Sequence, residues 1–435
     1  MQGTSRPESV STRLQRVAKL SKEAPEMVWT TLAYHIDLSL LKEAYRLTRK
    51  DGAVGIDGQT AREYEENLEE NLQDLLNRFK SGTYKAPPVR RSYVPKGDGK
   101  KMRPIGIPTF EDKLLQRAVV MVLEAVYEQD FLECSYGFRP KRSAHQALEE
   151  LWRDTMRVNG YVLEFDIEKC FDTLGHGHLR SFLDNRVRDG VIRRAIDKWL
   201  KAGVLEEGTV RYPGTGTPQG GVVSPILMNI YLHEVLDKWF AQEVKPRLSG
   251  EAYLIRYADD GVIVCRCKAD AERIMAVLPK RFERFALRLH PEKTRLIRFT
   301  RPGPGNNREG RPGSFDFLGF MHYWARSRKG IWVVKRKTAK DRFTRALERI
   351  GQWCRVHRHL PVKEQHRVLV LKLRGHAQYY YIRGNSSAVA RFYNEVRRRW
   401  HKWLNRRSQR SSMNWERFAR LLKRYPFPRP RLASS

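Results

Sequence analysis

The stretch that most restricts how this chain can fold is LIRYADDGVIV, residues 254–264, where two adjacent acids separate two short apolar runs. The apolar runs fit antiparallel strands, and Asp-Gly is a favoured dipeptide in the tight turn of a hairpin. The stretch therefore predicts a β-hairpin whose turn, Ala258 to Gly261, carries Asp259 and Asp260. Taken alone, this pattern is most typical of a surface turn with two solvated carboxylates.

A third acid, Asp166, interrupts the apolar strand pattern YVLEFD at 161–166. An uncompensated carboxylate in such a strand costs several kcal/mol or becomes protonated. If this strand lies beside the hairpin, Asp166, Asp259 and Asp260 meet at one sheet edge, and their repulsion favours a bound cation. Mg²⁺ is the natural ion, because it binds a few carboxylates together with the phosphates of a substrate. Two such ions about 3.5–4 Å apart promote in-line attack of a hydroxyl on a phosphate, which predicts nucleotidyl transfer.

The chain is strongly basic, with 83 Lys and Arg against 49 Asp and Glu among its 435 residues and a net charge of +34. The simplest partner for such a surface is a polyanion, and nucleic acid is favoured over an anionic membrane. Residues 321–435 hold 31 Lys and Arg but 5 Asp and Glu, so +26 of the +34 lies there. The sequence thus predicts an enzyme-like part followed by a strongly cationic part.

Membrane and secretory signals do not stand out along the chain. No apolar run approaches the roughly 20 residues that span a bilayer, and the polar N-terminus lacks the apolar stretch of a secretory signal. We therefore expect a cytoplasmic protein with no membrane partner. The five cysteines form no C-x-x-C pair, which argues against a disulfide framework or a zinc ribbon. Ordinary packing is favoured over metal binding for the closely spaced pairs Cys265 with Cys267, His176 with His178, and His357 with His359.

Hydrophobic periodicity predicts the remaining elements. Residues 1–30 are polar and are expected to form a mobile or late-ordering arm. After FDFLGF at 315–320 the pattern turns helical, with three amphipathic helices whose cationic faces can grip a nucleic-acid backbone. The other predicted elements are helices at 36–49, 61–80 and 111–127, two strands joined by a basic turn within 90–108, and a Gly-rich loop before a helix capped by Ser224.

The acids belong to an ordered set of motifs. FDIEKCFD, GTPQGGVVSPILMNIYL and YADD occur in this order, preceded by VPKGDGKKMRPIGIPTFEDKLLQRAV and SYGFRPKRSAHQAL and followed by LHPEKT, FDFLGF and LRGHAQYYY. In content and order, over about residues 30–410, the set resembles the reverse transcriptases encoded by group II introns. The resemblance implies an α+β right-hand polymerase, in which fingers and palm with an antiparallel sheet precede an α-helical thumb or maturase domain. The implied boundaries are an N-terminal extension at 1–60, fingers and palm at 61–325, thumb at 326–410 and a basic C-terminal tail at 411–435.

The resemblance also implies roles for individual residues. Asp166 and Asp259 match the main metal ligands, and Asp260 matches the second acid of the turn. Phe171 matches an aromatic residue that lies under the incoming sugar and excludes a 2′-hydroxyl, although its position alone is more typical of a core residue. The other matches are Lys96 and Arg103 for the triphosphate, with Lys100 or Lys101 as possible substitutes, Gln219 for the incoming nucleotide and template, and Lys293 near the primer.

The implied activity is that of an RNA-directed DNA polymerase with two Mg²⁺ ions and deoxynucleoside triphosphates. Its implied partners are group II intron RNA, an RNA template with a DNA primer, and a DNA target. No Cys pairs or His-Asn nuclease pattern follow the third amphipathic helix, so we expect no DNA endonuclease domain. Two alternatives stay open: an RNA-binding splicing chaperone without polymerase activity, and a related reverse transcriptase that serves DNA repair or phage defence.

Overall fold

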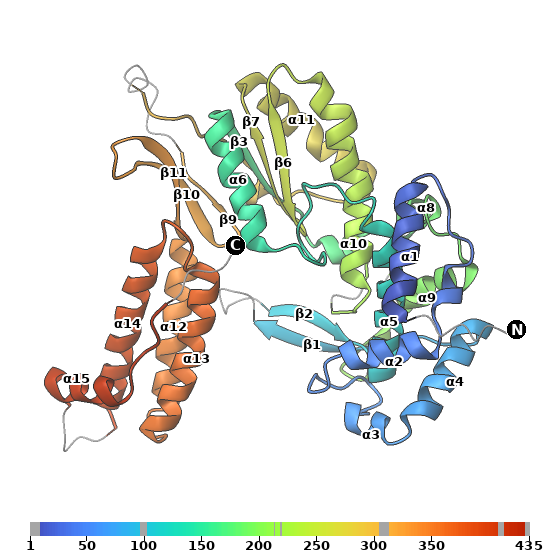
Figure 1. The fold of residues 1–435 in the computed structure, drawn as a ribbon, viewed down its shortest axis with the longest axis horizontal. Coiled ribbons are helices and arrows are strands. Elements are labelled where there is room, and N and C mark those ends of the chain that lie inside the picture. The colour runs from blue at the N-terminus through green and yellow to red at the C-terminus, as the bar shows by residue number, and fades with distance from the viewer. Residues whose placement is uncertain are drawn as a thin grey trace, which may run out of the picture. The chain divides into compact units, whose positions relative to one another are not determined.

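The structure is a computed structural model that describes residues 9–95, 102–212, 214–217, 220–303, 313–407 and 413–430. The chain divides into two compact units (Figure 1). Unit 1 combines residues 1–147 and 162–296, and unit 2 combines residues 148–161 and 297–435. Each unit contains helices and antiparallel strand pairs, so the predicted mixture of α and β structure is confirmed. The arrangement as a right hand, and its predicted boundaries, stay predictions.

Unit 1 contains a long buried helix, α5, Phe110–Tyr127. Thr109 caps it by accepting a hydrogen bond from the amide of Asp112, and apolar residues occupy more than one of its faces, which suits a helix enclosed by others. Helices α1 and α2 pack on it. The other helices of unit 1 are α1 Val10–Glu23, α2 Leu38–Leu47, α3 Ala61–Glu65, α4 Leu68–Ser81, α7 Cys170–Thr173, α8 His176–Asp184, α9 Gly190–Lys201, α10 Ser224–Leu232 and α11 Lys268–Arg284.

Unit 1 has two four-stranded sheets. In the first, with the order β2-β1-β4-β5, the predicted hairpin strands β1 and β2 pair in antiparallel fashion. The second has the order β6-β7-β3-β8, so the strand that ends at Asp166 lies next to the strand that begins at Asp260. The strands are β1 Val89–Pro95, β2 Met102–Ile107, β3 Tyr161–Asp166, β4 Val204–Glu206, β5 Thr209–Arg211, β6 Ala252–Tyr257, β7 Asp260–Cys265 and, at the boundary of the units, β8 Arg295–Arg298.

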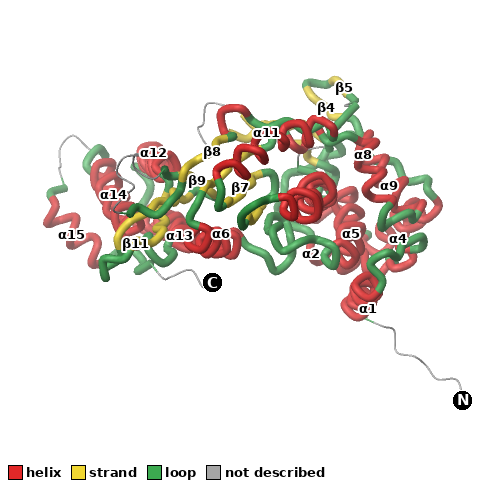
Figure 2. The backbone as a smooth tube through the Cα atoms, turned by 90° about the horizontal axis from the view of Figure 1, so that it is seen from above, coloured by secondary structure: helices red, strands yellow, loops and turns green. Residues whose placement is uncertain are grey.

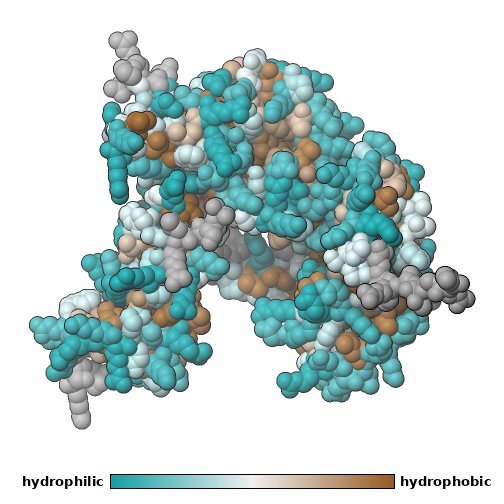
Figure 3. All heavy atoms as spheres, in the orientation of Figure 1, coloured by the Kyte–Doolittle hydropathy of each residue, from teal (hydrophilic) through white to brown (hydrophobic). Residues whose placement is uncertain are grey.

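Unit 2 combines an antiparallel sheet of order β11-β10-β9 with a helical bundle. In Figure 2, α12, α13 and α14 lie together beside β9 and β11. The bundle core is apolar, and Trp400, Leu369 and Val396 in it are fully buried. Hydrophilic side chains predominate on the face of α12–α15 seen in Figure 3. The elements are α6 Ala144–Val158, which begins in unit 1, β9 Phe315–Phe317, β10 Phe320–Arg326, β11 Trp332–Thr338, α12 Lys340–Val356, α13 Val362–Tyr380, α14 Ser386–Leu404 and α15 Trp415–Arg424.

Of the two expectations for the N-terminal arm, mobility is wrong for the described residues 9–30, and late ordering stays a prediction. Ser9 caps α1 by accepting from the amide of Thr12, and Val17 is fully buried. The buried Arg186 donates hydrogen bonds to the carbonyl oxygens of Ser21, Ala24, Pro25 and Met27, which follow one another at this end of the chain. Contacts to a residue distant in sequence therefore order a segment whose own composition is polar. Residues 1–8 lie outside the described residues.

Other boundaries also differ from the predictions. The helix predicted at 61–80 is broken between Glu65 and Leu68, and Val223 rather than Ser224 occupies the cap position of α10. The helical pattern predicted to follow FDFLGF begins only after β11, because residues 332–338 pair with β10 along their whole length. Helix α15 lies within the predicted basic tail, and its Phe418 is buried against the bundle core. No helix in the described ranges has the length and apolar character to cross a membrane.

Candidate active site

The predicted hairpin at 254–264 is present, and its turn is tightly packed. Tyr257 of β6 pairs with Asp260 of β7, and Ala258 adopts a left-handed backbone conformation with φ 58°. Gly261 of β7 lies against Phe165 of the neighbouring strand β3. A Cβ atom on Gly261 would come within 2.1 Å of the Phe165 ring, so only glycine fits at this position. Because Phe165 immediately precedes Asp166, this close packing holds the first acid beside the turn that carries the other two.

The three acids interact with one another. A hydrogen bond joins the Asp260 and Asp166 side chains, and the Nζ atom of Lys293 lies 2.7 Å from Oδ2 of Asp166. Loss of hydration and the negative charge of Asp166 raise the pKa of Asp259, while the positive charges of Arg103 and Lys293 oppose this rise. Asp260 is open to solvent, but the surrounding protein reduces its hydration, and together with the charge of Asp259 and the bond to Asp166 this raises its pKa to about 8.

These electrostatics have a consequence for cation binding. Carboxylates that lie this close together repel one another, a bound cation relieves that repulsion, and oxygen donors suit a hard divalent ion. In the present arrangement the ammonium group of Lys293 supplies the positive charge at Asp166. Among the described residues, no group of three or more His, Cys, Asp or Glu side chains is arranged to hold a metal ion. The chemistry of the donors fits a divalent cation, whereas the side chains of the described residues, with Asp166 paired to Lys293, do not form a metal-binding group.

Three of the other predicted site residues, Arg103, Phe171 and Lys293, lie on segments that approach these acids. Arg103, on β2, is exposed, and its charge lowers the pKa of Asp259. Phe171 lies on α7, directly after the strand that carries Asp166, and is partly buried. Lys293 lies next to the end of β3, because its Nζ atom donates a hydrogen bond to Oδ2 of Asp166. Lys96 and Gln219 lie outside the described residues, so their predicted roles remain predictions.

The segments on both sides of Gln219 are nonetheless anchored near the acids. The amide of Thr217 donates to the carbonyl oxygen of Phe171 at 2.7 Å, and the hydroxyl oxygens of Thr217 and Ser224 lie 2.6 Å apart. On the other side, a Cβ on Gly220 would come within 2.6 Å of the carbonyl oxygen of Gly106 in β2. Thr217 therefore lies against α7 and Gly220 lies against β2.

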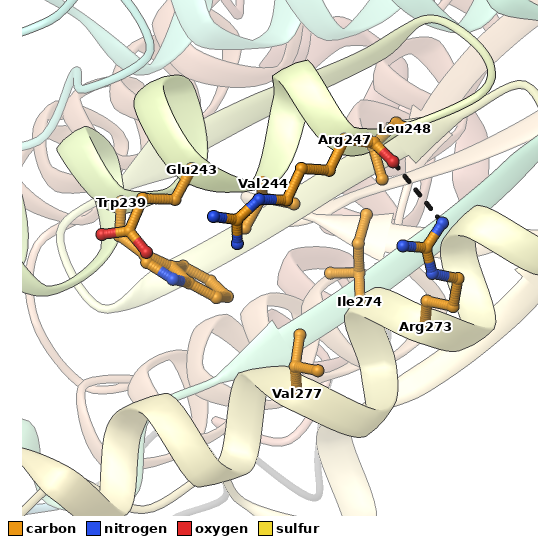
Figure 4. A pocket seen from close by; sticks show the side chains of 8 residues that line it. All are labelled: Trp239, Glu243, Val244, Arg247, Leu248, Arg273, Ile274 and Val277. Atoms are coloured by element: carbon orange, nitrogen blue, oxygen red, sulfur yellow. Dashed lines mark hydrogen bonds between the residues drawn. The ribbon is translucent and has the colours of Figure 1, made fainter.

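Four of the closely spaced His and Cys residues, His176, His178, His357 and Cys265, have contacts within the protein. The Nε2 atom of His176 lies 2.6 Å from the carbonyl oxygen of Gly216, and His178 stacks on Phe182. His357 stacks on Trp353, and Cys265 is buried in β7. A separate pocket of about 300 Å³ contains none of the predicted site residues (Figure 4). Its lining residues are Trp239, Glu243, Val244, Arg247, Leu248, Arg273, Ile274 and Val277.

The helical bundle of unit 2 is a second candidate surface. The exposed cations of its helices α13 and α14 are Lys363, Arg367, Lys372, Arg374, Arg391, Arg397, Arg398 and Lys402. Tyr379 and Tyr380, from the motif LRGHAQYYY, both lie near Phe320 of β10, and the hydroxyl group of Tyr379 donates to the carbonyl oxygen of Leu318. These two tyrosines therefore pack within unit 2, and the exposed basic side chains remain as its candidate nucleic-acid contacts.

One important residue was missed by the sequence analysis. Arg256 lies on β6, two residues before Ala258, and its side chain is fully buried. The sequence does contain an indication of this role, because an arginine in the apolar run LIRY requires buried hydrogen-bond or ion-pair partners. Those partners come from Ser135, Asn229 and Asp237, which no local pattern connects with the hairpin.

Comparison with known proteins was consistent with this geometry. Residues 94–322, slightly more than half of the chain, match the family described as "Reverse transcriptase (RNA-dependent DNA polymerase)". The chain is 42% identical over 243 residues to "Group II intron-encoded protein LtrA" of Lactococcus lactis subsp. cremoris, which covers 55% of this chain and 40% of that protein. It is 34% identical over 317 residues to "Protein YkfC" of Escherichia coli (strain K12), covering 66% of this chain and 80% of that protein. It is 33% identical over 236 residues to "Uncharacterized 91 kDa protein in cob intron" of Schizosaccharomyces pombe, covering 54% of this chain and 29% of that protein.

Proposed function

The chain belongs to the reverse transcriptase (RNA-dependent DNA polymerase) family, and on that premise we propose that it copies RNA into DNA and acts with a group II intron RNA. The similarity to the group II intron-encoded protein supports the second part. Because the chain spans about 40% of that relative's length, the activity and the partners of the whole relative enter here as proposals. They include an RNA template with a DNA primer, a DNA target, and intron RNA bound to promote splicing.

The observation that carries this proposal is the meeting of Asp166, Asp259 and Asp260 at the end of one sheet. Asp166 and Asp259 are the proposed ligands of divalent cations, with Asp260 as the second acid of the turn. A pair of Mg²⁺ ions bound there would supply charge stabilisation for the attack of a primer hydroxyl on a nucleotide phosphate. Both ions and the ligand roles are proposals drawn from the family and from the repulsion among these carboxylates.

The remaining residues act on the substrate. Arg103, whose charge already reaches Asp259, would neutralise the triphosphate together with Lys96, and oriented cations are effective at that task. Phe171 would lie under the incoming sugar, and Gln219 would contact the incoming nucleotide and template. Lys293 would release Asp166 and turn toward the primer backbone.

The cationic bundle of unit 2 would hold the intron RNA. Residues 321–435 contribute +26 to the net charge, and the exposed cations of α12–α14 can contact phosphates along a backbone. In this proposal unit 2 includes the thumb or maturase part of the protein. Binding to RNA would then depend strongly on salt, because each phosphate contact releases counterions.

The decisive experiment is primer extension on an RNA template by the Asp259→Asn variant. Synthesis should fall by about 10³-fold or more, since the variant lacks a charged ligand for the ions that organise the reaction. Intron RNA binding should stay within about twofold of the unmodified protein. The matched control is Asp184→Asn, which removes a half-exposed carboxylate that pairs with Arg193 on the surface. Normal synthesis by Asp259→Asn would contradict the proposal.

A second candidate function is that of an RNA-folding chaperone without polymerase activity. The ion pair between Lys293 and Asp166 favours it, because the lysine occupies the carboxylate that a metal ion would need. Two assays separate the two functions: primer extension over a range of Mg²⁺ concentrations, and splicing of a group II intron RNA with added protein. Splicing assistance without DNA synthesis at any Mg²⁺ concentration would favour the chaperone.

A further inference from the structure

Arg256 is the most deeply buried charged group next to the proposed site. Its side chain is 0% exposed, and it lies on β6 in the run that leads into the acidic turn. A guanidinium group has five N–H donors, and burial without partners would be strongly unfavourable. Loss of hydration by itself would lower the pKa of Arg256, but the charge and hydrogen bonds of Asp237 outweigh this and raise it. Arg256 is therefore a charged residue inside unit 1.

All five donors of Arg256 are used. Nε and Nη2 donate to the two carboxylate oxygens of Asp237 at 2.8 and 2.6 Å, which makes a bidentate pair with a residue that is itself 0% exposed. Nη2 also donates to Oγ of Ser135 at 2.8 Å. Nη1 donates to Oδ1 of Asn229 at 3.1 Å and to the carbonyl oxygen of Ala258 at 3.0 Å. A lysine could not replace this arrangement, since it lacks the planar fork.

The bond to Ala258 links this network to the acids. That carbonyl belongs to the peptide group that joins Ala258 to Asp259. Ala258 has the positive φ of 58° that L-residues with a side chain rarely adopt. Such a conformation persists only where its surroundings hold it. The guanidinium group is one such restraint, and it acts on the backbone next to the proposed metal ligand.

A second restraint comes from residues 134–137. The amide of Arg256 donates to the carbonyl oxygen of Cys134 at 2.7 Å, and the amide of Tyr136 donates to the carbonyl oxygen of Arg256 at 2.9 Å. A Cβ on Gly137 would come within 2.3 Å of the amide nitrogen of Ala258, so the two backbones are in direct contact. The side-chain amide of Asn229 donates to the carbonyl oxygen of Gly137 at 2.9 Å. Asn229 therefore joins both restraints.

We propose that Arg256, held by Asp237, is a positioning residue that fixes the backbone of Ala258 and so sets where the Asp259 carboxylate lies. We call Arg256, Asp237, Asn229, Ser135 and Gly137 the turn clamp. The inference rests on the proposed function as far as catalysis is concerned. A buried ion pair is a poor means of stabilising a fold, because apolar residues of similar volume often do as well. We therefore attribute to the Arg256–Asp237 pair a role in holding the geometry of the turn.

The first test measures the backbone itself by hydrogen–deuterium exchange of peptides that cover 254–262. In the Arg256→Gln variant, we expect exchange in this stretch to rise by about tenfold or more, because the turn loses its restraint. Asp237→Asn should have the same effect to a smaller degree. The matched control is Arg186→Gln, which breaks another buried ion pair, that of Arg186 with Asp130, but contacts residues 21–27. Its exchange at 254–262 should not change.

The second test separates positioning from stability. In primer extension, Arg256→Gln should lower kcat by about tenfold to a hundredfold, because small displacements of reacting groups have effects of that size. The KM for the nucleotide and the Kd for primer-template should stay within about twofold. The double variant Arg256→Gln/Asp237→Asn has no unpaired buried charge, so its Tm should recover toward that of the unmodified protein while kcat stays low. Arg256→Lys should keep the charge and still lose kcat.

The outcomes distinguish this inference from the proposed function. If the unmodified protein extends primers and Arg256→Gln matches it per folded molecule, the turn clamp is not a positioning device and the proposed function stands. If the unmodified protein does not extend primers, the proposed function fails, and the exchange experiment still decides whether Arg256 fixes the turn. Unchanged exchange at 254–262 in Arg256→Gln would overturn the inference in either case.

Discussion

Charged side chains near the acidic turn of unit 1 form close pairs with one another, whereas cations of α13 and α14 in unit 2 lie largely on the exposed surface of the bundle. Asp166 pairs with Lys293, and Arg256 pairs with Asp237. On α13 and α14, by contrast, the exposed cations form a field over an apolar core. The first arrangement fixes individual atoms, so single substitutions should have large effects there. The second acts through summed charge, so single cations should matter little and the core beneath them should matter more.

The largest effect that would test this difference is expected in the bundle core. Trp400 is fully buried, and its Nε1 atom donates to Oε1 of Gln365 at 3.0 Å. Trp400→Ala should lower the free energy of unfolding of unit 2 by about 3–5 kcal/mol, because it leaves a large cavity and an unpaired buried acceptor. Urea unfolding followed by circular dichroism measures this change.

The control for that variant is Trp415→Ala, which truncates a tryptophan that is 57% exposed. Its effect on unfolding should be within about 0.5 kcal/mol. RNA binding by Trp400→Ala should fall as the bundle unfolds and recover at temperatures where it folds. Full RNA binding by an unfolded bundle would show that unit 2 is not the RNA-binding surface.

The next effect concerns a buried acid of unit 1, Asp112. It accepts hydrogen bonds from Tyr84, from Nε1 of Trp199 at 2.7 Å and from Nε2 of Gln116 at 3.0 Å. Burial raises its pKa to about 6, although these hydrogen bonds oppose the rise. Because the folded-state pKa lies above the unfolded one, Asp112 contributes most stability below about pH 4, and this contribution is lost as the pH rises through 6.

Substitution of Asp112 by Asn should remove that pH dependence. Between pH 4 and pH 7.5, the free energy of unfolding of the unmodified protein should fall relative to Asp112→Asn by about 3 kcal/mol, as a shift of about two units implies. Urea unfolding at several pH values measures the difference. Asp184→Asn, on the surface, should show no such trend. If the difference in free energy of unfolding between the unmodified protein and Asp112→Asn were the same at every pH, the pKa of Asp112 would not change on folding.

The smallest effect is expected on RNA binding, from substitution of exposed cations on α13. Lys363, Arg367 and Arg374 are exposed, and their joint substitution by Gln should weaken RNA binding by about tenfold at low salt. The slope of log affinity against log salt should become shallower by about two to three. Filter binding over a series of salt concentrations measures both. Each single substitution should have an effect of less than about threefold.

The matched control removes three cations from unit 1 instead. Lys19, Lys42 and Arg46 pair with Glu23, Glu69 and Glu43 on the surface, so their joint substitution by Gln changes the net charge by the same amount. RNA affinity should change by less than about twofold. Equal losses in the two triple variants would mean that total charge, rather than the bundle, governs RNA binding.

The sequence predicted those parts of the molecule whose signals are local. The alternation in LIRYADDGVIV and the Asp-Gly turn are enough to place the hairpin, and the apolar periodicity is enough for α5, α12, α13 and α14. The position of β3 beside β7 could be assumed but not predicted, because the order of strands in a sheet depends on segments that are distant in sequence. Asp166 and Asp259 were therefore identified as candidates, and their metal-binding roles remain proposals.

Features that depend on distant partners were missed. Helix α1 has a polar composition and is ordered by Arg186, which lies 165 residues from Ser21. The strand β11 carries three consecutive cations, Lys335, Arg336 and Lys337, and was expected to belong to a helical region. Its pairing with β10 nevertheless determines its conformation. Arg256 was assigned no role from the sequence, since its partners Ser135 and Asp237 belong to other parts of the chain.

The contacts that hold the turn also bear on the order in which the protein folds. Ser135 and Arg256 are 121 residues apart, and Asp166 and Lys293 are 127 residues apart. Contacts that close such long loops form late, because the entropy of loop closure must be met before they stabilise the chain. During synthesis from the N-terminus, Asp166 therefore emerges from the ribosome long before the lysine that neutralises it. The acidic end of the sheet is thus among the last parts of unit 1 to reach its final form.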